Sequence, residues 1–289
     1  GTALLAAMLV LKVFETTDLR GARSLLGFSL FAPFAAFLQD QGPLTLALSV
    51  PAAVQAEDQY KLLVLAIPNK YHYEYIPIAR DSLEHLGKLH DFSFTWANNT
   101  SVFDGDLSQY AAVMFLNTPG EELNPAQRAR FEAYMRAGGN AIVVHRALIT
   151  PPGEWAWYEK MVGRSFVIHP MVQTAVVTPT DKGFPATYGL PDRWIWTDEY
   201  YVTANPYKVT IHPVLNVEES SYDPTKIWPG QVARPMGREH PVAWYHAYEK
   251  GRVFVTTLGH NGEMYRDPRY LDHLMGGIYW TATGRGQLP

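Results

Sequence analysis

Short apolar runs alternate with segments of helical periodicity over residues 61–145, and this alternation is the feature that most restricts the fold. The apolar runs at 62–67, 111–116 and 141–144 are typical of strands that are buried on both faces. Residues 92–96 alternate between aromatic and polar side chains, which predicts a further strand. Because such strands need helices on both faces of their sheet, the segments between them are expected to be helical.

Two of the connecting segments carry clear helix signals. Apolar residues recur at three- and four-residue spacing from Ile76 to Leu89, which gives one apolar helix face. A second helix is expected to begin at Asn124, with Pro125 at the first helical position and Gln127 completing a capping box. Strands that alternate with helices in this way predict an α/β protein with a doubly wound, mostly parallel sheet and right-handed crossovers.

Two histidines follow predicted strands at the point where each strand ends. His72 lies shortly after the first strand, and His145 comes directly after the fourth. Ligands of doubly wound sheets bind beyond the carboxyl ends of the strands. We therefore expect His72 and His145 to lie at the same edge of the sheet.

The second half of the chain is less regular and rich in Trp, Tyr and Pro. The last predicted strand runs into Gly259-His260-Asn261-Gly262, where a glycine on each side lets the backbone turn sharply and approach a ligand. A closing helix is expected to begin at Asp267-Pro268. The strands expected in this half are 175–178, 209–215, 242–248 and 252–258.

Residues 1–56 differ in composition from the rest, since they hold neither His nor Trp. Their apolar runs are shorter than the roughly 20 residues that cross a bilayer, so no stable membrane span is expected. Basic, apolar and small residues follow one another as in a secretory signal, which predicts a periplasmic or secreted protein with its folded domain at 57–289. The alternative is a wrongly assigned start or a poorly ordered apolar arm on a cytoplasmic protein, since secretory signals usually have about 15 to 30 residues.

Composition excludes several classes of function. The chain has no cysteine, so disulfides, thiolate metal ligands and cysteine nucleophiles are excluded. A net charge of -4 without long runs of either sign argues against a nucleic-acid partner. No GxGxxG, Walker or GxSxG motif is present, so a nucleotide cofactor and a serine hydrolase are not expected. A small-molecule ligand remains, and the oligomeric state stays open.

Five ordered motifs carry a resemblance to a known family. The motifs are Gly138-Gly139-Asn140-Ala141-Ile142-Val143-Val144-His145, Gly163-Arg164-Ser165-Phe166 with His169-Pro170, Asp198-Glu199-Tyr200-Tyr201, His240-Pro241-Val242-Ala243-Trp244, and Gly251-Arg252-Val253-Phe254 running to Leu258-Gly259-His260. With these motifs the chain resembles the trehalose-utilisation, or ThuA-like, family over residues 60–284. The resemblance implies a three-layer α/β/α flavodoxin-like domain, similar to class I glutamine amidotransferases, and an association with sugar metabolism.

The chain departs from the family and its fold relatives in two places. Where the family usually has a His-Pro-Ile-Thr-like segment, this chain reads Phe184-Pro185-Ala186-Thr187, so any role of that histidine is lost. His145 stands at the elbow where the amidotransferases place their nucleophilic cysteine. Glutamine hydrolysis through a thioester is therefore not available to this chain.

The candidate catalytic residues are His72, His145, Glu199 and His260, with His169 as a further member. Imidazole and carboxylate groups suit a divalent metal of zinc or manganese type, for which His145, Glu199 and His260 are the expected ligands. Without metal, the same groups could act as general acids and bases, with the pKa of Glu199 raised by nearby aromatic rings. A third interpretation is that some of these histidines only pack or cap.

Aromatic residues are concentrated in the same half of the chain as Glu199 and His260. Sugar faces stack well on aromatic rings, so Trp155, Trp157, Tyr200 and Trp244 are candidates for substrate binding, together with His169. The alternative for each ring is packing in the core, which the alternation Trp194-Ile195-Trp196 illustrates.

Two functions are compatible with these features. The first is an enzyme, a hydrolase or lyase, that cleaves or rearranges a small sugar or an oxidised (keto) sugar derivative. The second is a carbohydrate-binding protein without catalytic activity. Several titratable residues at predicted loop positions favour catalysis, because a pure binding protein would need mainly amide and aromatic side chains.

Overall fold

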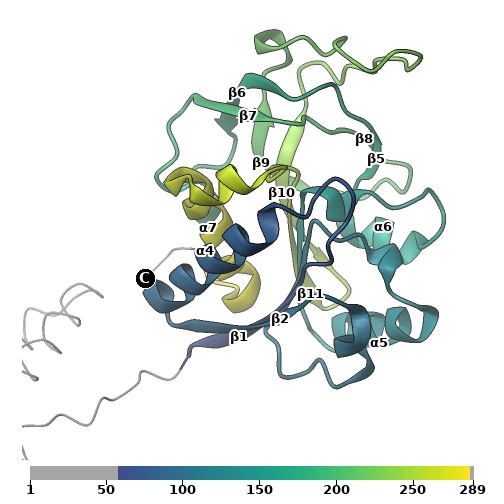
Figure 1. Ribbon diagram of the computed structural model, residues 1–289, viewed down its shortest axis with the longest axis vertical. Coiled ribbons are helices and arrows are strands. Elements are labelled where there is room, and N and C mark those ends of the chain that lie inside the picture. Colours follow the sequence, from purple (N-terminus) through teal and green to yellow (C-terminus); the bar gives the residue numbers. More distant parts are fainter. Residues whose placement is uncertain (1–57, 287–289) are drawn as a thin grey trace, which may run out of the picture. The chain divides into compact units, whose positions relative to one another are not determined.

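The computed structural model describes residues 58–286 (Figure 1). Within this range nine strands form one sheet in the order β2-β1-β3-β4-β11-β10-β9-β6-β7, and a separate pair, β5 and β8, forms a small second sheet. The strands are β1 (Tyr60–Leu65), β2 (Phe92–Ala97), β3 (Ala112–Leu116), β4 (Ala141–Val144), β5 (Ser165–Ile168), β6 (Gln173–Pro179), β7 (Trp194–Asp198), β8 (Val202–Ala204), β9 (His212–Val217), β10 (Pro241–Tyr248) and β11 (Gly251–Thr256).

The large sheet has a parallel and an antiparallel half. Strands β2, β1, β3, β4 and β11 are parallel, with Val113 and Val253 flanking Ala141 in register. Strands β10, β9, β6 and β7 extend the sheet by antiparallel pairing. The parallel half holds the strands expected from the alternating pattern, and the α/β, flavodoxin-like class is confirmed.

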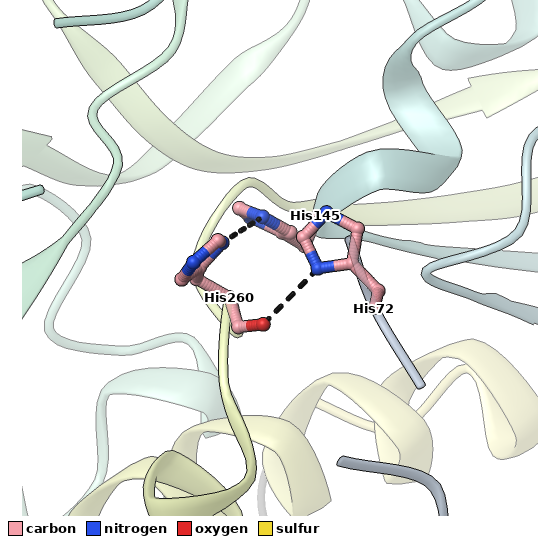
Figure 2. A group of neighbouring side chains, drawn as sticks. All are labelled: His72, His145 and His260. Atoms are coloured by element: carbon pink, nitrogen blue, oxygen red, sulfur yellow. Dashed lines mark hydrogen bonds between the residues drawn. The ribbon is translucent and has the colours of Figure 1, made fainter. Parts of the chain in front are cut away.

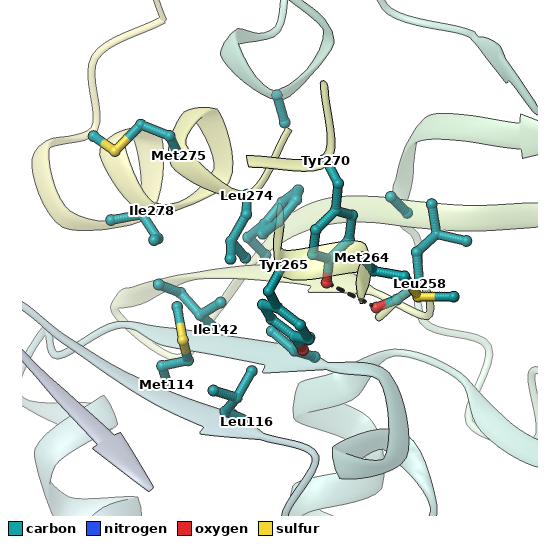
Figure 3. Close-up of a cluster of buried hydrophobic side chains, with 14 of the residues drawn as sticks. Met114, Leu116, Ile142, Leu258, Met264, Tyr265, Tyr270, Leu274, Met275 and Ile278 are labelled. Carbon is teal, nitrogen blue, oxygen red and sulfur yellow. Dashed lines mark hydrogen bonds between the residues drawn. The ribbon is translucent and has the colours of Figure 1, made fainter. Parts of the chain in front are cut away.

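Helices cover both faces of the sheet, which gives three layers (Figure 1). Helices α4 (Tyr75–His90) and α7 (Pro268–Thr283) pack on one face, and α5 (Pro125–Arg136) and α6 (Ala156–Val162) pack on the other. In Figure 3 the side chains of α7 lie over β3 and β4. The packed residues labelled there include Leu274, Met275, Ile278, Met114, Leu116 and Ile142.

Local signals in the sequence fix where two helices begin. The Asn124 side chain accepts hydrogen bonds from the backbone of Ala126 and Gln127, and the Gln127 side chain accepts one in return from the backbone of Asn124. Asp267 caps α7 through the backbone N–H groups of Arg269 and Tyr270. Both helix starts are as predicted.

One strand begins later than the sequence suggested. Strand β9 starts at His212 rather than at Val209. The Asn205 side chain accepts a hydrogen bond from the Val209 N–H at 2.8 Å and donates one to the Val209 carbonyl at 3.0 Å. Because both backbone groups of Val209 are bound in this turn, Val209 does not join the ladder.

The leader predicted at residues 1–56 lies outside the described residues. Among the helices in the described part of the chain, none has the length and apolar character that crossing a membrane requires.

Candidate functional site

His145 occupies a sharp turn directly after β4. Its backbone has a φ of 51°, in the left-handed region that costs a non-glycine residue about 1–3 kcal/mol. The side chain is fully buried, and its Nδ1 lies 2.6 Å from the carbonyl oxygen of Thr257. Because a carbonyl only accepts, Nδ1 carries the proton in the neutral ring, and the lone pair of Nε2 faces the site.

Two further histidines meet His145 at the carboxyl edge of the parallel strands (Figure 2). The His260 Nδ1 lies 3.3 Å from the His145 Nε2. The His72 Nδ1 lies 3.2 Å from the His260 carbonyl oxygen, which leaves the His72 Nε2 free to accept. One ring nitrogen from each of the three histidines lies within 4.8 Å of the others. The expectation that His72 and His145 share one sheet edge is confirmed.

Glu199 approaches the same nitrogens from the loop after β7. Its Oε2 lies 3.5 Å from the His145 Nε2 and 3.4 Å from the His260 Nδ1. The same oxygen lies 3.7 Å from the Nε2 of His169, whose side chain is 19% exposed at the rim. The structure thus brings together the predicted residues His72, His145, Glu199, His260 and His169.

The distances among His145, His260 and Glu199 fit a tetrahedral metal site. Metal bonds of about 2.0–2.1 Å place tetrahedral ligand atoms about 3.3–3.4 Å apart. The three atoms that face one another here are separated by 3.3, 3.4 and 3.5 Å. The donor set of two imidazoles and a carboxylate is one that divalent zinc or manganese accepts.

The charges of the site differ from the expectation for Glu199. Burial raises the pKa of this carboxyl, but its contacts with the imidazoles of His145 and His260, and the nearby ring of His169, outweigh burial, so the pKa is lowered. The expected rise was wrong because the rings nearest the carboxylate are imidazoles rather than apolar aromatics. Burial lowers the pKa of His260, and contact with Glu199 more than reverses this. Burial and the neighbouring His145 and His260 lower the pKa of His72 to about 3.

Asp198 positions the two loops that carry Glu199 and His260. This carboxylate is fully buried, and it accepts hydrogen bonds from the backbone N–H of Glu199 at 2.8 Å and of Gly259 at 2.9 Å. Asn117, with a φ of 50° after β3, donates to the Gly259 carbonyl at 3.2 Å. The sequence analysis missed both roles. The signal available was a polar residue at a strand end: Asn117 directly follows the buried strand β3, and Asp198 is the last residue of β7.

Tyr201 is a further neighbour that the sequence analysis did not place in the site. Its hydroxyl lies 3.0 Å from the His145 Nε2, and its ring is fully buried. The Tyr201 carbonyl oxygen lies 3.0 Å from the Nε2 of His240, a buried histidine whose Nδ1 lies 3.0 Å from the Oε1 of Glu219. A chain of buried polar contacts therefore connects the site to the loop before β10.

The aromatic residues predicted to bind substrate lie in packing positions instead. Trp244 is fully buried and donates its Nε1–H to the Val162 carbonyl, and the buried Tyr200 donates to the Trp196 carbonyl. Trp155 packs in the core under α5 and α6, where Trp157 also packs. The rings of Trp155, Tyr200 and Trp244 fill the core, and Trp157 packs against the core while staying partly exposed.

Exposed aromatic rings lie near the site at other positions. Trp228 is 40% exposed, and its ring stands edge-on to His169 with centroids 6.2 Å apart. Tyr71 and Tyr73, which flank His72 in the sequence, are also exposed.

Solved structures similar to this chain include two ThuA-like proteins. A putative ThuA-like protein from Bacteroides uniformis is 21% identical, with 80% of this chain and 94% of that chain covered and a TM-score of 0.67. A putative ThuA-like protein from Parabacteroides merdae is 19% identical, with 78% and 91% covered and a TM-score of 0.63. An α-L-fucosidase from Paenibacillus thiaminolyticus is 11% identical over 80% of this chain and 34% of its own, with a TM-score of 0.51.

At these identities the similarity shows the fold alone. No relative was found among the curated proteins. The family model for trehalose utilisation, ThuA, matches residues 61–281, a range that holds the parallel sheet and all the histidines of the site. The chain therefore belongs to the ThuA, or trehalose-utilisation, family.

Proposed function

We propose that this protein is an enzyme that cleaves or rearranges a small sugar or an oxidised sugar derivative at a divalent metal held by His145, Glu199 and His260. Membership of the ThuA family associates the chain with carbohydrate utilisation in general. The observation that carries the finer proposal is the triangle of ligand atoms, whose edges of 3.3–3.5 Å match those of a tetrahedral metal site.

The orientation of the histidines supports a metal site. Metal-ligating histidines usually donate their second ring N–H to a carbonyl or carboxylate, which fixes the tautomer. His145 does so to Thr257 at 2.6 Å, and His72 does so to the His260 carbonyl at 3.2 Å. His72 thereby presents a free Nε2 as a possible further ligand or as a hydrogen-bond acceptor for a substrate hydroxyl.

The surrounding residues divide into those that fix the site and those that meet a substrate. A metal held here would polarise a sugar oxygen or lower the pKa of a bound water. Asp198 and Asn117 hold the loops of Glu199 and His260 in place. His169 and Trp228 stand at the exposed side, where the imidazole can bond a hydroxyl and the indole can stack on a sugar face.

Product analysis separates this proposal from a binding protein without catalytic activity. The purified protein is incubated with disaccharides and their 3-keto forms, with added zinc, added manganese or a chelator, and the products are followed by mass spectrometry. We expect metal-dependent conversion that Glu199→Gln abolishes and Glu263→Gln retains, since Glu263 is exposed and pairs with Arg266 at the surface. Saturable sugar binding without any conversion would support the binding protein instead.

We also propose export to the periplasm or the medium, because charged, apolar and small residues follow one another in the first 56 positions as they do in a secretory signal. N-terminal sequencing of the protein recovered from the periplasm should find a start near Glu57 to Lys61. Recovery of an intact leader on soluble cytoplasmic protein would contradict export.

A further inference from the structure

A cavity of about 820 Å³ lies between the small β5–β8 sheet and strands β9 and β10. Its walls include apolar side chains from Ile211, Pro213 and Pro241. Its polar lining includes Arg164, Thr203 and Arg238. None of His72, His145 and His260 lines this cavity. It is therefore a candidate for a second, separate ligand site.

Arg164 is a partly buried cation without a carboxylate partner in the part of the chain that the structure describes. Its Nη1 donates to the carbonyls of Gly163 at 2.7 Å and Val209 at 2.9 Å, which fixes the guanidinium. No acidic side chain within residues 58–286 forms an ion pair with it, and burial lowers its pKa. A partly buried guanidinium held in this way has hydrogen-bond donors left over for an anion.

Thr203 places a second unsatisfied group on the same cavity wall. The residue is 8% exposed, and its Oγ1 is buried without a hydrogen-bond partner. A buried hydroxyl without a partner costs free energy, so natural proteins rarely keep one that nothing satisfies. An acceptor on a bound molecule would satisfy it.

Arg238 adds a second guanidinium to the lining, and Glu239 adds an acidic side chain. Within the described residues Arg238 forms no ion pair either. Guanidinium groups match the oxygens of carboxylates and phosphates. We propose that this cavity binds a small organic oxyanion, with Arg164 and Arg238 contacting the oxyanion and Thr203 donating a hydrogen bond to it.

Calorimetric titration of the full chain at low ionic strength tests this site, with inorganic phosphate, glucose 6-phosphate and gluconate as separate probes. We expect saturable binding of at least one of the two organic probes, glucose 6-phosphate and gluconate. Preference for glucose 6-phosphate over gluconate would identify the ligand's oxyanion as a phosphate monoester, and the reverse preference would identify it as a carboxylate. Binding of inorganic phosphate alone, or of no probe, would overturn the proposal of an organic ligand.

Two variants with matched controls locate the binding. Thr203→Val is isosteric, and Arg238→Gln changes an exposed side chain, so both should fold. Each should weaken binding about tenfold, the value of one hydrogen bond to a charged group. Thr180 lines the same cavity, but its hydroxyl already donates a hydrogen bond to the Pro213 carbonyl, and Arg234 lies outside the lining. The control variants Thr180→Val and Arg234→Gln should therefore bind the probes as wild type does.

Stability and metal-site readouts separate this proposal from a packing role and from the proposed enzyme. Thr203→Val should unfold at the same temperature as wild type or higher, because it removes an unsatisfied buried hydroxyl. Glu199→Gln should leave probe affinity unchanged. Wild-type affinity in both Thr203→Val and Arg238→Gln would refute the site, whatever the outcome of the sugar-conversion experiment.

Discussion

Replacing Gly259 by Ala should both destabilise the fold and disable the candidate site. Gly259 has a φ of 117°, which only glycine adopts readily, and its carbonyl and N–H are held by Asn117 and Asp198. A Cβ at this position would lie 3.0 Å from the Tyr265 hydroxyl, and it would collide with the Tyr270 hydroxyl. His260 follows directly, so any shift of this turn moves a candidate ligand.

The size of the effect follows from two separate costs. Backbone strain at a glycine-only conformation is worth about 1–3 kcal/mol. Overpacking against a buried neighbour adds about 1–3 kcal/mol. We therefore expect Gly259→Ala to lower the free energy of unfolding by about 2–6 kcal/mol. For a domain of this size, each kcal/mol corresponds to about 2–4 °C in Tm.

Gly138 supplies a matched control, because its φ is 108° but a Cβ there would meet nothing within 4 Å. Gly138→Ala therefore pays for strain alone, about 1–3 kcal/mol. Urea unfolding followed by circular dichroism gives both free energies. Equal losses in the two variants would refute the collision with Tyr270, and metal binding by Gly259→Ala at wild-type affinity would refute the positioning of His260.

Three further predictions follow from other contacts. Glu199→Gln should abolish turnover and metal binding with little loss of stability. His145→Ala should also abolish both, but it should lower the free energy of unfolding by about 1–3 kcal/mol, because the Thr257 carbonyl loses its donor. Activity assays and thermal unfolding check both variants. Trp244→Phe should cost about 1–3 kcal/mol, because the Val162 carbonyl loses its donor, yet leave sugar conversion unchanged, and a selective loss of substrate affinity would contradict this packing role. Burial lowers the pKa of His273 to about 4, so the unfolded chain binds more protons between pH 4 and 6.5. The stability that neutral His273 contributes should therefore be complete above pH 6.5 and fall by about 1.4 kcal/mol per unit below it. Burial also lowers the pKa of His246 to about 4, so His273→Gln should reduce the slope of stability against pH in urea unfolding rather than remove it. An unchanged slope would show that His273 does not contribute.

The parallel half of the fold could be predicted because its signals are local. Apolar runs, helical periodicity and the capping box at Asn124 each depend on residues close together in the chain. The antiparallel half was less predictable, since a side chain four residues away decided that Val209 stays in a turn. No periodicity records that kind of contact.

The candidate site was predictable to the extent that topology decides it. His72 and His145 follow parallel strands, and such strands end at one edge. The direction of the pKa shift of Glu199 depended on which rings lie nearest, which only the packed structure supplies. The same holds for the indoles: Trp244 and Trp155 face the core, whereas the exposed Trp228 lies in a loop near His169.

Metal content tests the central proposal most directly. The wild-type protein and the variants His145→Ala, Glu199→Gln and His85→Gln are dialysed against zinc and against manganese, and bound metal is measured by elemental analysis. His85 is exposed on α4, so its variant controls for surface histidines. We predict stoichiometric metal in the wild type and in His85→Gln, and loss of it in the other two. Equal metal content in all four proteins, or none in the wild type, would contradict a metal held by His145, Glu199 and His260.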